Sequence, residues 1–282
     1  MDFFLSLVIA GACVGSVYAL VAVGLNLTFW TTKTLNFGQG AVMMLCAIST
    51  ALLTAQGISN GVGVIVERIA VRPALKTAGS MGWVIATLGF GILLQGITSK
   101  FFGSQAIPFP EVLFTVQDVI DIGGQNISLQ YVSIFVVSIL IIVVLEGLTR
   151  YTVLGTAIRG TAQDMELAIV QGLPVNLIVS GSFVLSSIMA GIAGILTAQI
   201  SGTVDPAFGF ELVLMGFVAA VLGGMGSSAG ALVGGIIVGI IGKLVGGYIS
   251  TAAEHGIAFA LLILMLALRP EGFFGRAEVS KA

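Results

Sequence analysis

The chain has 282 residues, of which 57% are hydrophobic and only 9% are charged, and its formal net charge is −2. A soluble domain carries about a quarter charged residues, so this composition excludes a water-soluble protein and predicts a polytopic membrane protein without a nucleic-acid partner. The two cysteines, Cys13 and Cys46, stand alone within apolar runs, and we expect them to be packing residues rather than a disulfide or a metal site.

The apolar runs predict an all-α, polytopic transmembrane helical bundle of about eight spans that forms a single domain over residues 1–282. In chain order the predicted helices cover residues 4–30, 40–55, 81–99, 131–148, 175–200, 212–223, 231–249 and 256–268.

The basic residues predict the orientation of these spans. If the polar connection 149–174 lies in the cytoplasm, nine of the eleven Lys and Arg residues lie on that side, and only Lys100 and Lys243 do not. The positive-inside rule favours this arrangement over its inverse. The N-terminus and the loop 100–130 are therefore predicted to be external, and the C-terminus cytoplasmic.

One stretch does not satisfy this topology. An outward-to-inward span is required between the second predicted helix and the basic loop that begins at Glu67, and only residues 57–66 are available. A helix of that length reaches about 15 Å, half of the hydrocarbon thickness. A span is therefore truncated or missing near 57–66, and we favour a missing span.

The connection 149–174 is predicted to contain a short amphipathic helix. Thr161 or Asp164 can cap its start, and Gly172, followed by Pro174, can end it. An ordinary amphipathic loop on the membrane surface is the alternative interpretation. The predicted apolar patch of the helix consists of Leu167, Ala168 and Val170.

Two glycine-rich stretches interrupt or flank the spans. Gly38 and Gly40 surround Gln39, and Gly223 and Gly224 lie within a re-entrant segment expected near 222–230. Such glycines can expose backbone groups to a substrate at discontinuous helices, or they can simply permit close packing of helices.

Three polar residues lie within the predicted spans. Lys243 is expected to snorkel outward or to form an ion pair with a partner subunit, because an unpaired charge in lipid is costly. Asn26 and Gln95 can line a path or form hydrogen bonds between helices.

Several motifs resemble one transporter family. The spaced residues of 159–172 resemble the loop through which permease subunits of bacterial ABC importers dock onto their ATPases. Four further stretches resemble the LIV-H type of permease in high-affinity branched-chain amino acid importers. The chain departs from that family at two places: Gln39 stands where the family often has His, and the short stretch 57–66 stands where the family has a full span. These stretches are 36–40 (Asn-Phe-Gly-Gln-Gly), 67–73 (Glu-Arg-Ile-Ala-Val-Arg-Pro), 220–227 (Ala-Val-Leu-Gly-Gly-Met-Gly-Ser) and 269–276 (Arg-Pro-Glu-Gly-Phe-Phe-Gly-Arg).

The resemblance implies a permease subunit of an ATP-driven importer of branched-chain or related amino acids in the bacterial cytoplasmic (inner) membrane. Its implied partners are a second homologous permease, two cytoplasmic ATPase subunits, an external or periplasmic substrate-binding protein and membrane lipid. ATP and Mg are used by the partner subunits, and the chain itself binds no cofactor or metal and has no catalytic residues. The implied ATPase-coupling residues are Arg159, Ala162, Asp164, Glu166, Leu167, Ala168 and Gly172. The residues expected in a substrate path or in close helix packing are Asn36, Gly38, Gln39, Gly40, Gly223 and Gly224.

Other functional classes fit the sequence less well. Gly242-Lys243 lacks the upstream Gly and the following Ser or Thr of a P-loop, so another chain must hydrolyse ATP. The alternative is a gradient-driven secondary transporter or channel for a small polar solute such as urea or an amide, but such carriers usually place carboxylates or histidines within their spans. A membrane enzyme would need paired polar groups that one His and two separated Cys do not supply.

Overall fold

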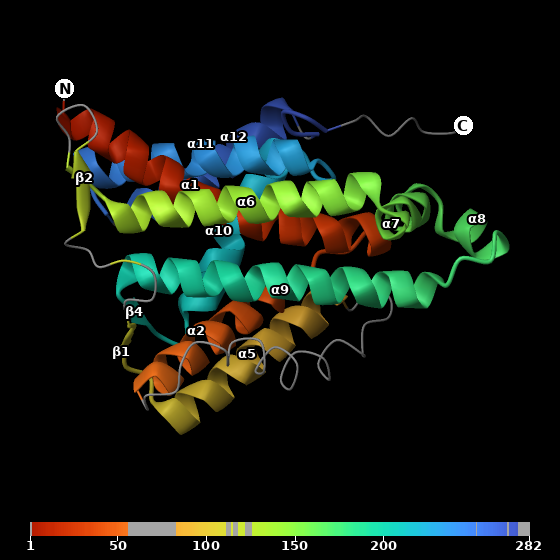
Figure 1. Ribbon diagram of the computed structural model, residues 1–282, viewed down its shortest axis with the longest axis horizontal. Coiled ribbons are helices and arrows are strands. Elements are labelled where there is room, and N and C mark those ends of the chain that lie inside the picture. The colour runs from red at the N-terminus through yellow and green to blue at the C-terminus, as the bar shows by residue number, and fades with distance from the viewer. Residues whose placement is uncertain are drawn as a thin grey trace.

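The computed structural model describes residues 2–55, 83–110, 114, 118–121, 126–251, 253–269 and 271–275. Within them the chain forms a bundle of apolar helices (Figure 1). These helices are α1 (Asp2–Thr32), α2 (Gln39–Ala55), α5 (Trp83–Phe102), α6 (Leu129–Tyr151), α9 (Val175–Ser201), α10 (Phe208–Gly223), α11 (Ser228–Tyr248) and α12 (Ala253–Leu268).

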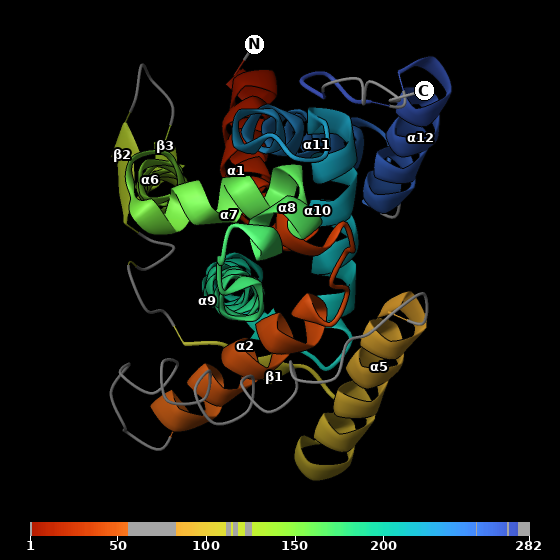
Figure 2. The same ribbon diagram turned by 90° about the vertical axis from the view of Figure 1, so that its right-hand side faces the viewer.

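All eight apolar helices predicted from the sequence are therefore present, which confirms the helical membrane fold. Four of them, α1, α6, α9 and α11, are long and apolar enough to cross a membrane. Figure 2 looks along the bundle: α6 and α9 are seen end-on, whereas α10 runs across the view. The smaller elements, which the sequence did not predict apart from a helix near α8, are α7 (Val153–Gln163), α8 (Met165–Val170), β1 (Ile107–Pro108), β2 (Val119–Asp121), β3 (Asn126–Ser128) and β4 (Thr203–Val204).

Helix α1 lies at the centre of the bundle, and its residues from Ala19 to Leu25 are almost completely buried. A helix that is hydrophobic on every side is expected to be buried in this way. Its closest neighbour is α11, and the two backbones touch: a Cβ atom on Gly15 would lie 2.6 Å from the carbonyl oxygen of Gly235. Glycine permits this approach where lipid supplies no hydrophobic drive for helix association.

The connections between helices gather at the two ends of the bundle. The strands β1 and β4 pair antiparallel, with Ile107 opposite Val204, and the backbone N–H of Phe109 donates to Gly202 O at 2.9 Å. The loop 100–130, which is predicted to be external, is thus hydrogen-bonded to the connection between α9 and α10. Helices α7 and α8 project from the opposite end (Figure 1).

Three sequence predictions fall on residues that the structure does not describe. The missing or truncated span at 57–66, the basic stretch 67–73 and the terminal Arg276 all lie outside the described residues. The segment 222–230, by contrast, is described: it contains the end of α10, a tight turn at 224–227 and the start of α11.

Candidate functional site

Helix α8 is closed at both ends by its own residues. Asp164 has an extended backbone, and its Oδ1 accepts a hydrogen bond from the N–H of Leu167 at 3.0 Å, which is an N-cap. Gly172 adopts a positive φ of 79°, and its N–H donates to Ile169 O at 3.0 Å. The structure therefore places the start and end of this helix where the sequence predicted them, with Asp164 rather than Thr161 as the cap.

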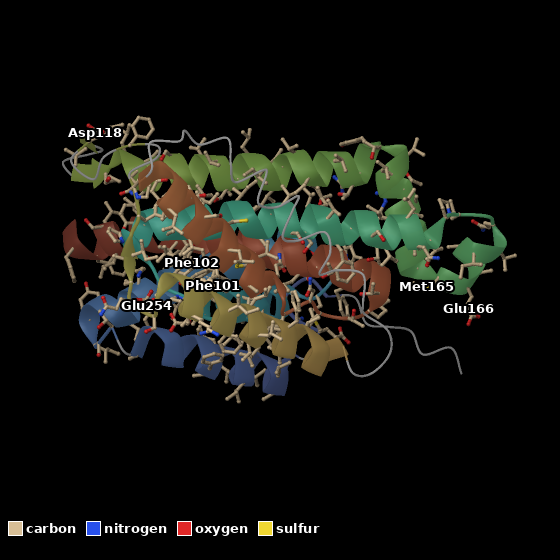
Figure 3. All side chains as sticks on the ribbon, turned by 90° about the horizontal axis from the view of Figure 1, so that it is seen from below. Phe101, Phe102, Asp118, Met165, Glu166 and Glu254 are labelled. Atoms are coloured by element: carbon tan, nitrogen blue, oxygen red, sulfur yellow. The ribbon has the colours of Figure 1, made fainter. Side chains whose placement is uncertain are left out.

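The short helix presents an apolar surface to its surroundings. Met165, Leu167, Ile169 and Val170 are all exposed, and Val170 is 83% exposed. We call these four residues the α8 patch. Of the three residues of the predicted apolar patch, Leu167 and Val170 are exposed, whereas Ala168 is only 3% exposed. Figure 3 shows Met165 and Glu166 at the end of the molecule opposite Asp118.

A second helix, α7, precedes α8 and was not predicted. It buries Gly155, Ile158 and Thr161 against the ends of α1, α6 and α9. Its local signals are the possible N-cap Thr152 and the spacing of these three buried positions, i, i+3 and i+6, which its glycines and polar residues obscure. Of the predicted coupling residues on α7, exposed Arg159 donates from Nη2 to Arg150 O at 3.2 Å, and Ala162 is half-buried.

Gln39 points into the core of the bundle. It is completely buried, and its Nε2 donates to Ser186 O of α9 at 3.2 Å. A Cβ atom on Gly24 of α1 would lie 2.5 Å from that nitrogen, so three helices enclose the amide. Asn36 is also buried, and a Cβ atom on Gly38 would approach its Oδ1 to 3.1 Å.

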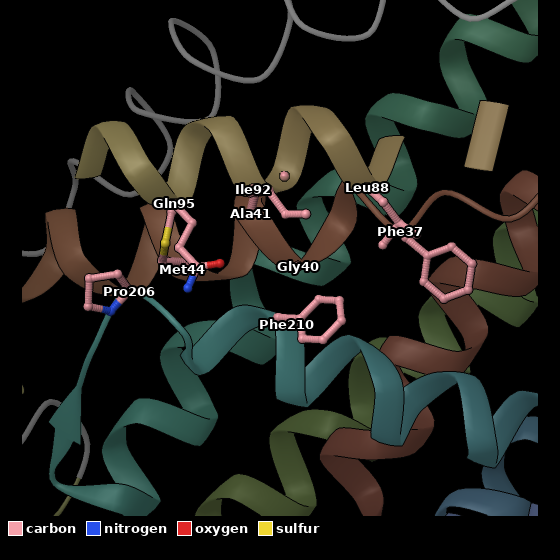
Figure 4. A pocket seen from close by; sticks show the side chains of 10 residues that line it. Phe37, Gly40, Ala41, Met44, Leu88, Ile92, Gln95, Pro206 and Phe210 are labelled. Atoms are coloured by element: carbon pink, nitrogen blue, oxygen red, sulfur yellow. The ribbon is translucent and has the colours of Figure 1, made fainter. Parts of the chain in front are cut away.

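The opposite face of α2 borders a pocket (Figure 4). Gly40 belongs to this face, where a Cβ atom would lie 2.6 Å from the carbonyl oxygen of Gly209 at the start of α10. Gln95 on α5 contributes the polar side chain among otherwise apolar neighbours. The pocket lies between α2, α5 and the start of α10, and its lining residues are Phe37, Gly40, Ala41, Met44, Leu88, Gly91, Ile92, Gln95, Pro206 and Phe210.

Gly223 and Gly224 lie at the turn between α10 and α11, away from this pocket. Gly224 has a positive φ of 99°, which an L side chain rarely adopts. The C-terminal motif bonds to this turn: the N–H of Phe273 donates to Leu222 O at 2.9 Å, and that of Phe274 to Gly223 O at 3.0 Å. These donors satisfy carbonyl groups that would otherwise lack partners at the end of α10.

Asn26 of α1 forms hydrogen bonds to the same turn between α10 and α11. Its Nδ2 donates to Ser227 O at 3.2 Å, and its Oδ1 accepts from the N–H of Gly226 at 3.3 Å. Asn26 therefore forms hydrogen bonds between α1 and the α10–α11 turn.

Lys243 finds its partner within the chain. Its Nζ lies 2.8 Å from Oε1 of Glu254 in the first turn of α12. Lys243 thus has a partner that the sequence did not predict, and the ion pair joins α11 to α12. Among the described residues, no three His, Cys, Asp or Glu side chains gather as ligands for a metal ion.

Apolar helices packed through glycine contacts, with a capped connector projecting from one end, define a polytopic helical membrane protein. The chain belongs to the family of permease components of branched-chain amino acid transport systems, whose pattern it matches over residues 7–268.

Individual relatives cover nearly the whole chain. The high-affinity branched-chain amino acid transport permease LivH of Salmonella typhimurium is 33% identical, over 99% of this chain and 98% of the relative. The probable LivH of Methanocaldococcus jannaschii is 32% identical, over 95% and 92%. Among solved structures, PsaBC from Streptococcus pneumoniae in complex with Fab matches with a TM-score of 0.53 at 15% identity, over 94% of this chain and 92% of that one. This last likeness concerns the fold alone.

Proposed function

We propose that the chain is the membrane permease subunit of an ATP-driven importer of branched-chain or related amino acids. It acts in the inner membrane, with its N-terminus outside and its C-terminus in the cytoplasm. A second homologous permease, two cytoplasmic ATPase subunits and an external substrate-binding protein complete the system, and the ATPases use ATP and Mg. Membership of the permease family supports this proposal.

The α8 patch is the observation that carries the coupling role. Its apolar side chains are exposed beyond one end of the bundle, and the helix is too short and too tightly capped to be a membrane span. Exposed apolar patches on an ordered element are typical of protein contact sites. The ATPase is the partner required there, because the chain carries no P-loop of its own.

The pocket beside α2 is our candidate for the substrate path. Its lining is almost entirely apolar, which suits an aliphatic side chain, and Gln95 can orient a polar group. Gln39 and Asn36 face the core rather than this pocket, so their proposed contribution is to fix the position of α2.

Two valines allow a matched test of the α8 patch. Val170 is 83% exposed in the patch, and Val153 is 88% exposed at the start of α7. After co-expression with the ATPases and the second permease, Val170→Asp is expected to weaken ATPase association by about tenfold or more, as for a residue central to an interface. Val153→Asp is the control and should retain binding. Equal retention by both variants would refute the assignment of the patch, and failure of the wild-type chain to bind any ATPase would refute the proposed function.

We also propose that this chain lacks one span near residues 57–66. The alignment with the Salmonella relative runs over 304 positions and this chain has 282 residues, so at least 22 positions hold a residue of the relative and none of this chain. About 20 residues are one membrane-spanning helix, and the charge distribution requires one extra crossing at this point. Sequencing of the intact gene tests the proposal, which fails if the reading frame contains no additional apolar segment there.

A further inference from the structure

We propose that Gly155 is a positioning residue of the importer: by holding the start of α7 in backbone contact with the end of α6, it fixes α7 rigidly between α8 and the helices α1, α6 and α9. The inference rests on the proposed coupling function and names the part of the permease that receives the movement.

The corner between α6 and α7 leaves no room for a flexible hinge. Helix α6 ends at Tyr151 and α7 begins at Val153, so a single residue, Thr152, joins them. The N–H of Thr152 donates to Leu148 O at 3.3 Å, and its Oγ1 accepts from the N–H of Gly155 at 3.1 Å. The joining residue is thus bonded to both helices.

Gly155 brings the two helices into backbone contact at this corner. A Cβ atom there would collide with the backbone of Thr149, including its carbonyl carbon and oxygen. Thr149 is itself buried, so it cannot move aside without shifting the end of α6. Close approach of two backbones is a recognised reason for glycine inside an element.

The buried face of α7 is attached to two other spans. Ile158 of α7 forms an apolar cluster with Leu27 of α1 and Ile178 of α9, and all three side chains are at least nine-tenths buried. Trp30 packs against the edge of this cluster. Because packed interiors resist continuous deformation, displacement of α7 must displace the ends of α1 and α9 as well.

The far end of α7 leads directly to the α8 patch. Asp164 alone separates α7 from α8, and its N–H still donates to Gly160 O at 3.3 Å. No flexible linker therefore lies between the exposed patch and the three spans. A connector of this kind converts movement of a docked ATPase into movement of helices.

Two glycines of α7 provide the test. A methyl group at Gly155 meets backbone atoms, whereas at Gly160 its nearest neighbour is Leu173 Cδ1 at 3.9 Å. In proteoliposomes with the complete importer, Gly155→Ala is expected to raise the ratio of ATP hydrolysed to amino acid imported by about fivefold or more. ATPase binding should persist, because the α8 patch is unchanged, and Gly160→Ala should keep the wild-type ratio.

Thr152 supplies a second pair of variants, since Gly155→Ala can also disturb folding. Thr152→Ala removes the cap, and Thr152→Ser keeps a hydroxyl that can accept from Gly155. We expect the Ala variant to be partly uncoupled and the Ser variant to be coupled. If both Ala substitutions leave the ratio unchanged in a coupled wild-type importer, the connector role is wrong. If the wild-type chain itself shows no ATP-dependent uptake, the proposed function fails instead.

Discussion

The ion pair between Lys243 and Glu254 should contribute measurably to the attachment of α12. Its two charged atoms are 2.8 Å apart, with side chains 30% and 18% exposed. Glycines of α11 leave room for the carboxylate, and a Cβ atom on Gly246 would lie 3.0 Å from Oε2. The pair therefore differs from a solvated surface bridge, which typically contributes less than about 1 kcal/mol.

The expected magnitude follows from this geometry. At 2.8 Å and an effective dielectric constant of about 20, the attraction between unit charges is about 6 kcal/mol. Loss of hydration offsets most of it, so we expect a net coupling of about 1–3 kcal/mol. For a chain of this size that corresponds to a shift in melting temperature of about 2 °C per kcal/mol.

A double-mutant cycle measures the coupling directly. Lys243→Met, Glu254→Gln and the double variant are unfolded thermally in lipid nanodiscs, with Lys100→Met as an exposed control. We expect each single variant to be destabilised, the double variant to lose less than the sum of both, and the control to match the wild type. Strict additivity of the two single effects would refute the inference that this contact stabilises α12.

Two further predictions concern helix packing and topology. In thermal unfolding, Gly40→Ala should destabilise the protein by about 1–3 kcal/mol, because the new methyl group would lie 2.6 Å from the carbonyl oxygen of Gly209. Gly181 faces open space, so Gly181→Ala is the control and should be neutral or slightly stabilising. With the two buried native cysteines unreactive, Lys100→Cys and Glu166→Cys should react with a membrane-impermeant thiol reagent from opposite faces of the membrane, and labelling from the same face would contradict the topology.

The helices could be predicted because unbroken apolar length is a local property. Eight apolar runs gave eight helices, and no knowledge of their neighbours was required. Helix α7 could not be predicted in this way. Its formation depends on Thr152 as a cap and on burial of Ile158 against Leu27 and Ile178, which lie far away in the sequence.

In the candidate site, too, features set by nearby residues could be predicted, and features set by distant contacts could not. Asp164 and Gly172 could be predicted as the ends of α8 because capping depends on nearby residues. The buried position of Ala168 could not be predicted from the sequence. A six-residue helix makes fewer than two turns, so tertiary packing decides which side faces inward. The partner of Lys243 likewise depends on the register of α12 against α11.

The glycine contacts extend the consequence of a rigid α7. Gly15 and Gly235 bring α1 and α11 together backbone against backbone, and a Cβ atom on Gly11 would lie 2.6 Å from Ile240 Cα. No flexible side chain lies between the two helices at these points, so small sliding movements meet steric resistance. Movement that reaches α1 through Ile158 must therefore move α11 with it. By contrast, a Cβ atom on Gly89 of α5 would meet no atom of the described residues within 4 Å, so this glycine does not hold α5 against a neighbour as Gly15 holds α1 against α11.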